Sequence, residues 1–288
     1  MTVTTRTLDV PGAVLTYDVA EPASPPAARP LLLVGSPMGA AGFGTLRGFF
    51  GDRVVVTYDP RGVERSVLTP DAEPATPRTH ADDLHRVVAA LDAGPVDVFA
   101  SSGGAVNALA WVTEHPDDVV TLVAHEPPLP SVLPDAAEAT AAMHALSGTY
   151  ARDGWGHAMA GFLALVAHEG PVPADWTQRP APDPAALGLP VDDDGSRDDP
   201  LFAVNLLTLP AYELDVDALR TAATRVVVAV GAESGENLAA RGARAVAALL
   251  GDGATVLPGD HGGFLGGEYG QTGVPDRFGP ALRTLVDA

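Results

Sequence analysis

The sequence predicts an α/β protein built on a mostly parallel, doubly wound sheet. Short apolar runs alternate with helical patterns from the start of the chain to about residue 130, and the alternation resumes after residue 223. Nearly continuous apolar runs of this kind are typical of parallel strands that are covered on both faces. The chain has 288 residues, of which 46% are hydrophobic, and can therefore bury a large core.

Each predicted strand is a short apolar run that ends at a turn signal. An amino-terminal hairpin is expected over residues 5–19, because Pro11 and Gly12 form a turn signal between two strand-like runs. The other predicted strands lie at 31–34, 54–58, 96–100, 119–124, 225–230 and 254–257. Apolar residues at helical spacing predict helices at 80–91, 105–111, 237–250 and 277–286.

Residues 131–222 have a different composition. They comprise Ala-rich helical segments at 136–150, 156–167 and 202–209, and a loop rich in Pro and Asp at 179–200. We interpret this segment as a helical cap inserted after the sixth strand, over a core domain formed by residues 1–130 and 223–288. Met and Phe at helical spacing within it are interpreted as packing of the cap itself.

The composition excludes several functions. The chain has no Cys, which rules out disulfides, thiolate metal sites and a cysteine nucleophile. Its formal net charge of −20 makes nucleic acid and anionic membranes poor partners. The amino terminus lacks a signal-peptide pattern and no apolar stretch reaches the roughly 18 residues of a membrane span, so a cytoplasmic protein is expected. The sequence leaves a homodimer open.

The stretch Ala100-Ser101-Ser102-Gly103-Gly104 is the strongest chemical signal in the chain. It lies between a predicted strand and a predicted helix, with small residues two places either side of Ser102. A serine on a sharp strand-to-helix turn needs such neighbours, and the turn lifts its hydroxyl above the carboxyl edge of the sheet. Ser102 is therefore the candidate nucleophile.

A serine nucleophile requires a histidine base and a carboxylate that orients the histidine. His261 follows the last predicted strand in a Gly-rich loop and is the candidate base. Two acids compete for the third role, Glu126 after the strand at 119–124 and Glu233 after the strand at 225–230, and strand order alone does not choose between them. His125, at the end of its strand, is a candidate for orienting work or substrate contact.

Two backbone N–H groups are expected to stabilise the developing oxyanion. Gly103, directly after the nucleophile, supplies one of them. The loop Gly35-Ser36-Pro37-Met38-Gly39 supplies the other, and Ser36 is the candidate because Pro37 has no N–H. Met38 in the same loop is a further candidate for substrate contact.

Together these residues resemble the α/β-hydrolase superfamily over nearly the whole chain. The stretch Asp59-Pro60-Arg61-Gly62-Val63-Glu64-Arg65-Ser66 is similar to the superfamily's Asp-x-Arg-Gly-x-Gly-x-Ser stretch, although Glu64 replaces a Gly. Val34-Gly35 stands where His-Gly is usual before the oxyanion residue. Within the superfamily, His125-Glu126-Pro127-Pro128 resembles the His-Glu-x-Pro stretch of zearalenone lactonase-like hydrolases. That resemblance implies a triad of Ser102, Glu126 and His261.

The predicted function is a cofactor-independent serine hydrolase that cleaves an ester or lactone of an apolar small molecule through an acyl-enzyme. Two alternatives stay open: a carbon-carbon bond hydrolase on the same triad, and a ligand-binding protein on a hydrolase scaffold. No metal is predicted, because the acidic run at 192–194 lacks the alternating ligand spacing of a calcium loop.

Overall fold

The computed structural model describes residues 1–288, through which a nine-stranded sheet runs. The strand order is β1-β2-β4-β3-β6-β7-β8-β9, and β5 pairs with β2 outside this path. Only the pairs that involve β2 are antiparallel, which confirms the mostly parallel sheet. The strands are β1 (Thr2–Val10), β2 (Ala13–Glu21), β3 (Leu31–Val34), β4 (Val55–Asp59), β5 (Val67–Leu68), β6 (Val96–Ser101), β7 (Val119–His125), β8 (Arg225–Gly231) and β9 (Thr255–Leu257).

Helices cover both faces of the sheet, as a doubly wound fold requires. The larger buried cluster packs α2 (Pro77–Leu91), α3 (Gly103–Glu114) and α8 (Leu238–Leu250) on one face. A second cluster packs α9 (Pro275–Val286) and the short helical turns η1 (Ala40–Phe43), α1 (Gly44–Arg47) and η2 (Gly48–Phe50) on the other. Alternate residues of the central strands belong to different clusters, since successive side chains of a strand point to opposite faces.

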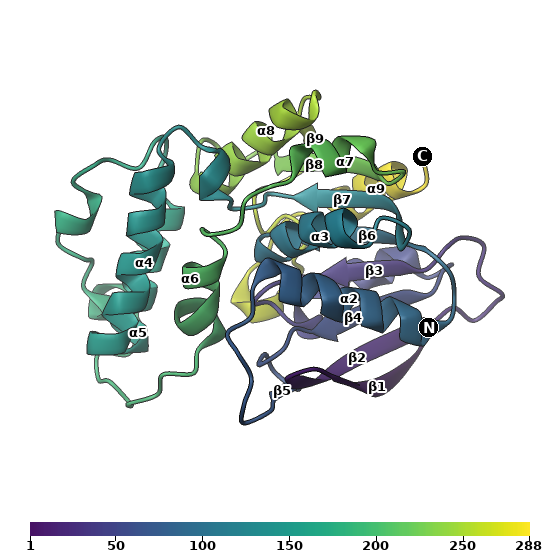
Figure 1. Cartoon of the computed structure of the whole chain (residues 1–288), viewed down its shortest axis with the longest axis horizontal. Helices are drawn as coiled ribbons and strands as arrows, with labels where there is room; N and C mark the ends of the chain where they lie inside the picture. The colour runs from purple at the N-terminus through teal and green to yellow at the C-terminus, as the bar shows by residue number, and fades with distance from the viewer.

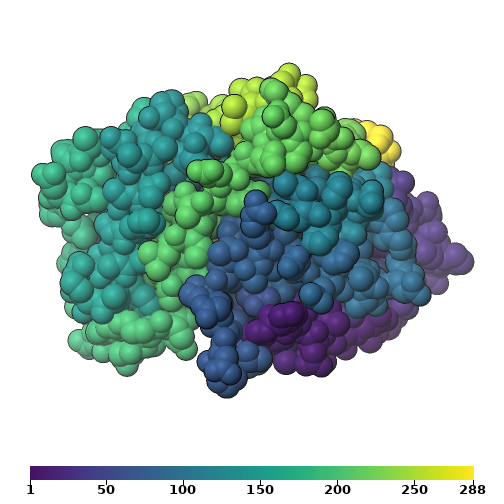
Figure 2. Space-filling view, in the orientation of Figure 1, coloured from purple at the N-terminus to yellow at the C-terminus, as the bar shows by residue number.

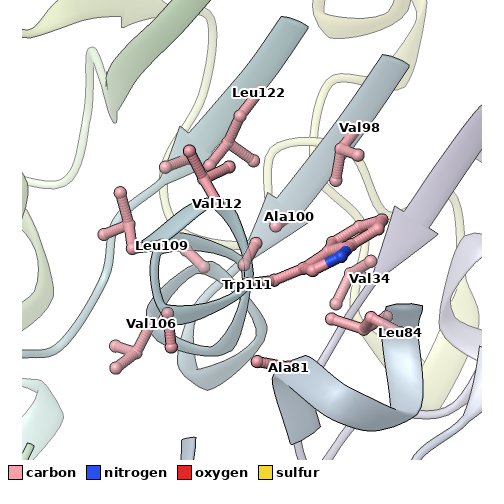
Figure 3. Packing of buried hydrophobic residues seen from close by; sticks show 14 of the residues in the cluster. Val34, Ala81, Leu84, Val98, Ala100, Val106, Leu109, Trp111, Val112 and Leu122 are labelled. Atoms are coloured by element: carbon pink, nitrogen blue, oxygen red, sulfur yellow. The ribbon is translucent and has the colours of Figure 1, made fainter. Parts of the chain in front are cut away.

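Trp111 anchors α3 to the sheet. Its side chain is completely buried, and Figure 3 shows the indole between α3 and the strands, near Val34 and Val98, with Leu84 of α2 alongside. Burial of a side chain of this size contributes on the order of a few kcal/mol to folding. The amino end of α3, which carries the candidate nucleophile, is therefore held on a rigid support.

The helical segment between β7 and β8 forms its own buried cluster beyond the carboxyl ends of the parallel strands (Figure 1). It contains α4 (Ala136–Asp153), α5 (Trp155–Val166), a π-helical turn at Leu201–Asn205 and α6 (Leu206–Thr208). The short 3₁₀ turns are η3 (Pro130–Val132), η4 (Trp176–Gln178) and η5 (Pro184–Leu187), while η7 (Glu268–Gly270) follows the last strand. In Figure 2 the segment, in teal and green, is packed directly against the rest of the molecule.

Two local features differ from the sequence prediction. The helix predicted at 202–209 begins as a π-helical turn rather than an α-helix. The helix α7 (Val216–Thr221) lies inside the predicted cap by number, yet its Leu219 is buried in the cluster that packs α3 and α8 on the sheet. Because β5 was not predicted, the strand counted as the sixth in the sequence is β7 in the structure.

Candidate active site

Ser102 occupies the sharp turn between β6 and α3. Its backbone has φ 58° and ψ −132°, a conformation that costs a non-Gly residue on the order of 1–3 kcal/mol and that clusters at functional sites. The turn is tight, because a Cβ added to Gly104 would lie 2.6 Å from the carbonyl oxygen of Val34. Ser102 N–H donates to the carbonyl of His125 at 3.0 Å, which ties the turn to the end of β7.

His261 and Glu126 form a hydrogen-bonded pair. His261 Nδ1 lies 2.6 Å from Glu126 Oε2, and the N–H of Gly231 donates to Glu126 Oε1 at 2.8 Å. Burial would raise the pKa of Glu126, but the hydrogen bond from His261 and the nearby histidines outweigh it and lower the pKa to about 2. Glu126 is therefore ionised at neutral pH and can orient His261 and stabilise its positive charge.

Ser102 and Glu126 lie at matching positions on neighbouring strands. In the β6–β7 register Ser101 faces His125, so the residue after each strand falls at the same edge, and parallel strands are about 5 Å apart. The structure contains no hydrogen bond to the Ser102 hydroxyl, and none joins it to His261. Hydrogen bonds between a nucleophile and its base are often long in enzymes without substrate.

Glu233 stands apart from this pair. Its side chain is exposed, and its backbone N–H donates to the carbonyl of Gly259 at 2.9 Å. His261 Nδ1 is already engaged by Glu126, and no hydrogen bond joins Glu233 to His261. Of the two acids that the sequence left open, the geometry brings Glu126 to the histidine.

The two candidate oxyanion donors approach each other closely. Ser36 and Gly103 are both buried, and a Cβ added to Gly103 would lie 2.6 Å from the carbonyl oxygen of Ser36. The N–H groups of Ser36 and Gly103 donate to no other backbone carbonyl in the structure. Two unpaired donors beside a serine hydroxyl can stabilise an oxyanion.

Met38 and Asp59 shape the loop that carries Ser36. Met38 is half-buried over Gly42, since a Cβ added there would lie 2.3 Å from its sulfur. Asp59 is fully buried and its Oδ1 accepts from the N–H of Ala40 at 2.8 Å. The Asp59 stretch therefore holds the loop in place from behind.

His125 lies beneath His261 rather than in a position to touch substrate. It is fully buried, its Nδ1 is 3.1 Å from the Ser101 hydroxyl, and its ring lies over that of His261 with centroids 5.9 Å apart. Burial lowers the pKa of His125 to about 4, so the ring is neutral at pH 7. Substrate contact by His125 is thus wrong, because the side chain is sealed from solvent, and an orienting position remains.

The sequence analysis missed Asn205. The π-helical turn of the helical segment directs its side chain amide onto the hydroxyl of Ser36, with Nδ2 donating to Oγ at 3.0 Å, and both residues are at most 5% exposed. No other side-chain hydrogen bond links this turn to the oxyanion loop. The only available signal was a single Asn in an apolar helical pattern, at a separation of 169 residues from its partner.

Known proteins share this architecture. The chain is 37% identical over 136 residues to the uncharacterized hydrolase YraK of Bacillus subtilis (strain 168), and the matched region covers 46% of this chain and 48% of that relative. An alpha/beta hydrolase from Sphaerobacter thermophilus DSM 20745 superposes with a TM-score of 0.64 at 20% identity, over 97% of this chain and 99% of the other. The chain has the α/β-hydrolase fold.

A second solved structure with this fold is the enol-lactonase from Burkholderia xenovorans LB400, with a TM-score of 0.66 and 18% identity over 98% of this chain and 100% of the other. No family model matches the chain. The match to YraK spans about half the length of that relative. In open α/β sheets ligands bind beyond the carboxyl ends of the strands, which is where the α/β-hydrolase fold places Ser102, Glu126 and His261 here.

Proposed function

We propose that this chain is a cofactor-independent serine hydrolase that cleaves an ester or lactone of an apolar small molecule. The observation that carries the proposal is the combination of a strained serine at the β6–α3 turn with a His261–Glu126 pair at the same edge of the sheet. The similarity to a hydrolase and to an enol-lactonase of the same fold supports this class of reaction.

The proposed mechanism assigns a role to each group. His261 removes the proton from Ser102 as its oxygen attacks the carbonyl, and ionised Glu126 stabilises the imidazolium that results. The backbone N–H groups of Ser36 and Gly103 donate to the oxyanion of the tetrahedral intermediate. The alcohol then leaves with the proton from His261, and water releases the acyl group from Ser102 by the same steps in reverse order.

The substrate is assigned by class. The lower edge of the helical segment supplies Leu209, whose Cδ1 would lie 3.3 Å from a Cβ added to Gly103, so apolar atoms border the nucleophile turn. In this proposal residues 131–222 act as the cap over the core and select an apolar acyl or alcohol part. The finer resemblance to zearalenone lactonase-like hydrolases favours a lactone. We expect no nucleic acid or membrane partner, and no helix is long and apolar enough to cross a bilayer.

The test is turnover of three panels by the wild-type chain and by Ser102→Ala: p-nitrophenyl esters of increasing acyl length, aromatic lactones, and vinylogous diketones. Ester or lactone turnover that disappears in Ser102→Ala supports the proposal. Faster turnover of diketones than of any ester would favour carbon-carbon bond cleavage on the same triad. Absence of turnover across all three panels, with binding of these compounds retained, would favour a ligand-binding protein.

A further inference from the structure

A cluster of histidines and carboxylates lies far from the serine site, where α2 crosses the end of α3. His85 belongs to α2, His115 follows the last residue of α3, and Asp118 lies in the turn before β7. One nitrogen or oxygen from each of these three residues lies within 4.8 Å of the others. The twelve residues of α3 separate this cluster from Ser102 by about 18 Å.

The cluster is built from two pairs of residues three positions apart. Asp82 and His85 lie on one face of α2, while His115 and Asp118 flank the turn after α3. The hydrogen bonds cross between the pairs: His85 Nδ1 is 2.7 Å from Asp118 Oδ2, and His115 Nε2 is 3.0 Å from Asp82 Oδ1. Each imidazole therefore has one carboxylate partner from the other segment.

The carboxylate of Asp118 is also held from the interior of the protein. The indole Nε1 of Trp111, the buried residue seen in Figure 3, donates to Asp118 Oδ2 at 2.8 Å. Carboxylates that bind metals are commonly fixed by such a second hydrogen bond, and metal-binding histidines commonly donate their other nitrogen to a carboxylate, as His115 does toward Asp82. The supporting contacts of a metal site are thus already formed.

We propose that His85, His115 and Asp118 bind one Zn²⁺ ion, with Asp82 orienting His115. Two imidazoles and a carboxylate suit Zn²⁺ better than the hard ions Mg²⁺ and Ca²⁺, which prefer oxygen alone. The ion takes the place of the proton shared by His85 Nδ1 and Asp118. Asp82 occupies Nε2 of His115, so Nδ1 of His115 is its ligating atom. The net charge of −20 favours a cation at this surface.

Binding requires a small rearrangement. Ligand atoms on a tetrahedral zinc are about 3.4 Å apart, so separations of up to 4.8 Å have to close by at most about 1.4 Å. The two rings lie parallel, with centroids 4.0 Å apart, and imidazole lone pairs lie in the ring plane, so both rings must turn about their Cβ–Cγ bonds. The side chains of His85 and His115 are 42% and 25% exposed, which leaves room for this rotation.

The test is calorimetric titration of the chelator-treated full-length chain with zinc chloride, paired with thermal unfolding with and without zinc. Wild type should bind one ion with micromolar affinity or tighter and unfold at a higher temperature with zinc, because the ion joins α2 to the α3–β7 turn only in the folded state. His85→Gln and His115→Gln should each weaken binding by at least about tenfold and abolish the thermal shift.

Two controls locate the ion. His144→Gln removes an exposed histidine on α4, and His261→Gln removes the histidine of the serine site; both variants should bind zinc as wild type does. If a cluster variant does not fold, Asp82→Asn tests the same claim through an exposed residue and should weaken binding about tenfold. Absence of zinc binding by wild type, or equal binding by wild type and His115→Gln, would overturn the proposal and leave two ordinary His–Asp pairs.

Discussion

The sheet core and the helical segment of residues 131–222 hold their polar groups in different ways. In the core, Glu126 is fixed by a backbone N–H and by His261, and it is fully buried. The helical segment contributes one buried polar contact to this edge, from Asn205 to Ser36, and exposes apolar side chains such as Leu163 and Leu207. The comparison indicates that the chemistry is built into the sheet, while the helical segment adjusts it and faces the substrate.

The largest effect should come from the core nucleophile. Ser102→Ala removes the group that forms the acyl-enzyme, so ester or lactone turnover should fall by a factor on the order of a million. The measurement is kcat for the best substrate of the panels, with circular dichroism to verify the fold. A variant that keeps a tenth of wild-type turnover would remove the chemistry from this edge of the sheet.

The next effect should separate the two acids. Glu126→Gln keeps the shape of the side chain but removes the charge that stabilises His261, so kcat should fall by about 10⁴. Glu233→Gln is the matched control, because the exposed Glu233 makes no contact with His261, and it should change kcat less than twofold. Equal losses in the two variants would mean that the histidine changes its partner during turnover.

A third prediction concerns the pH dependence of core stability. His125 has its pKa lowered to about 4 by burial, whereas a histidine in the unfolded chain titrates near 6.5. Between these values the unfolded state takes up a proton that the folded state does not, so stability falls as the pH drops from about 6.5 to about 4. The loss from this residue should approach about 3 kcal/mol.

Denaturant unfolding of wild type and His125→Gln at pH 7 and pH 4.5 measures this loss. The variant should lose less stability than wild type between the two pH values, whatever its stability at pH 7. His80, which is also buried with its pKa lowered, is present in both proteins and cancels in the comparison. Equal losses in the two proteins would show that His125 is not sealed in its neutral form.

The smallest effect should come from the helical segment. Asn205→Leu removes the hydrogen bond to Ser36, which is worth about 1 kcal/mol, so kcat should fall by roughly fivefold with little change in KM. Leu207→Ala, an exposed change on the neighbouring helix, should leave kcat unchanged and affect KM for long acyl chains. A drop of 10³ or more in Asn205→Leu would place the segment inside the chemistry and end the distinction.

The sequence predicted the core better than the contacts between its parts. The strands at 31–34, 119–124 and 225–230 were recognisable because fully buried parallel strands are continuous apolar runs, and each lies within a residue of its observed bounds. The Ser102 turn was recognisable because steric crowding there demands small residues.

The choice between Glu126 and Glu233 and the partner of Asn205 were not predictable from local patterns. Both depend on which side chains meet across strand ends or across more than a hundred residues of chain. The helix α7 was grouped with the cap because composition does not reveal that Leu219 returns to the sheet. Local propensity specifies elements, and long-range packing specifies the site.

The most direct test of the central claim is whether Ser102 is chemically activated. The wild-type chain and the Ser102→Ala variant are each incubated with a fluorophosphonate probe, and intact mass and peptide mapping locate any adduct. One adduct on Ser102 of wild type, absent from the variant, is the predicted result. A folded wild-type protein without an adduct, or an adduct at another serine, would contradict the assignment of Ser102 as the nucleophile.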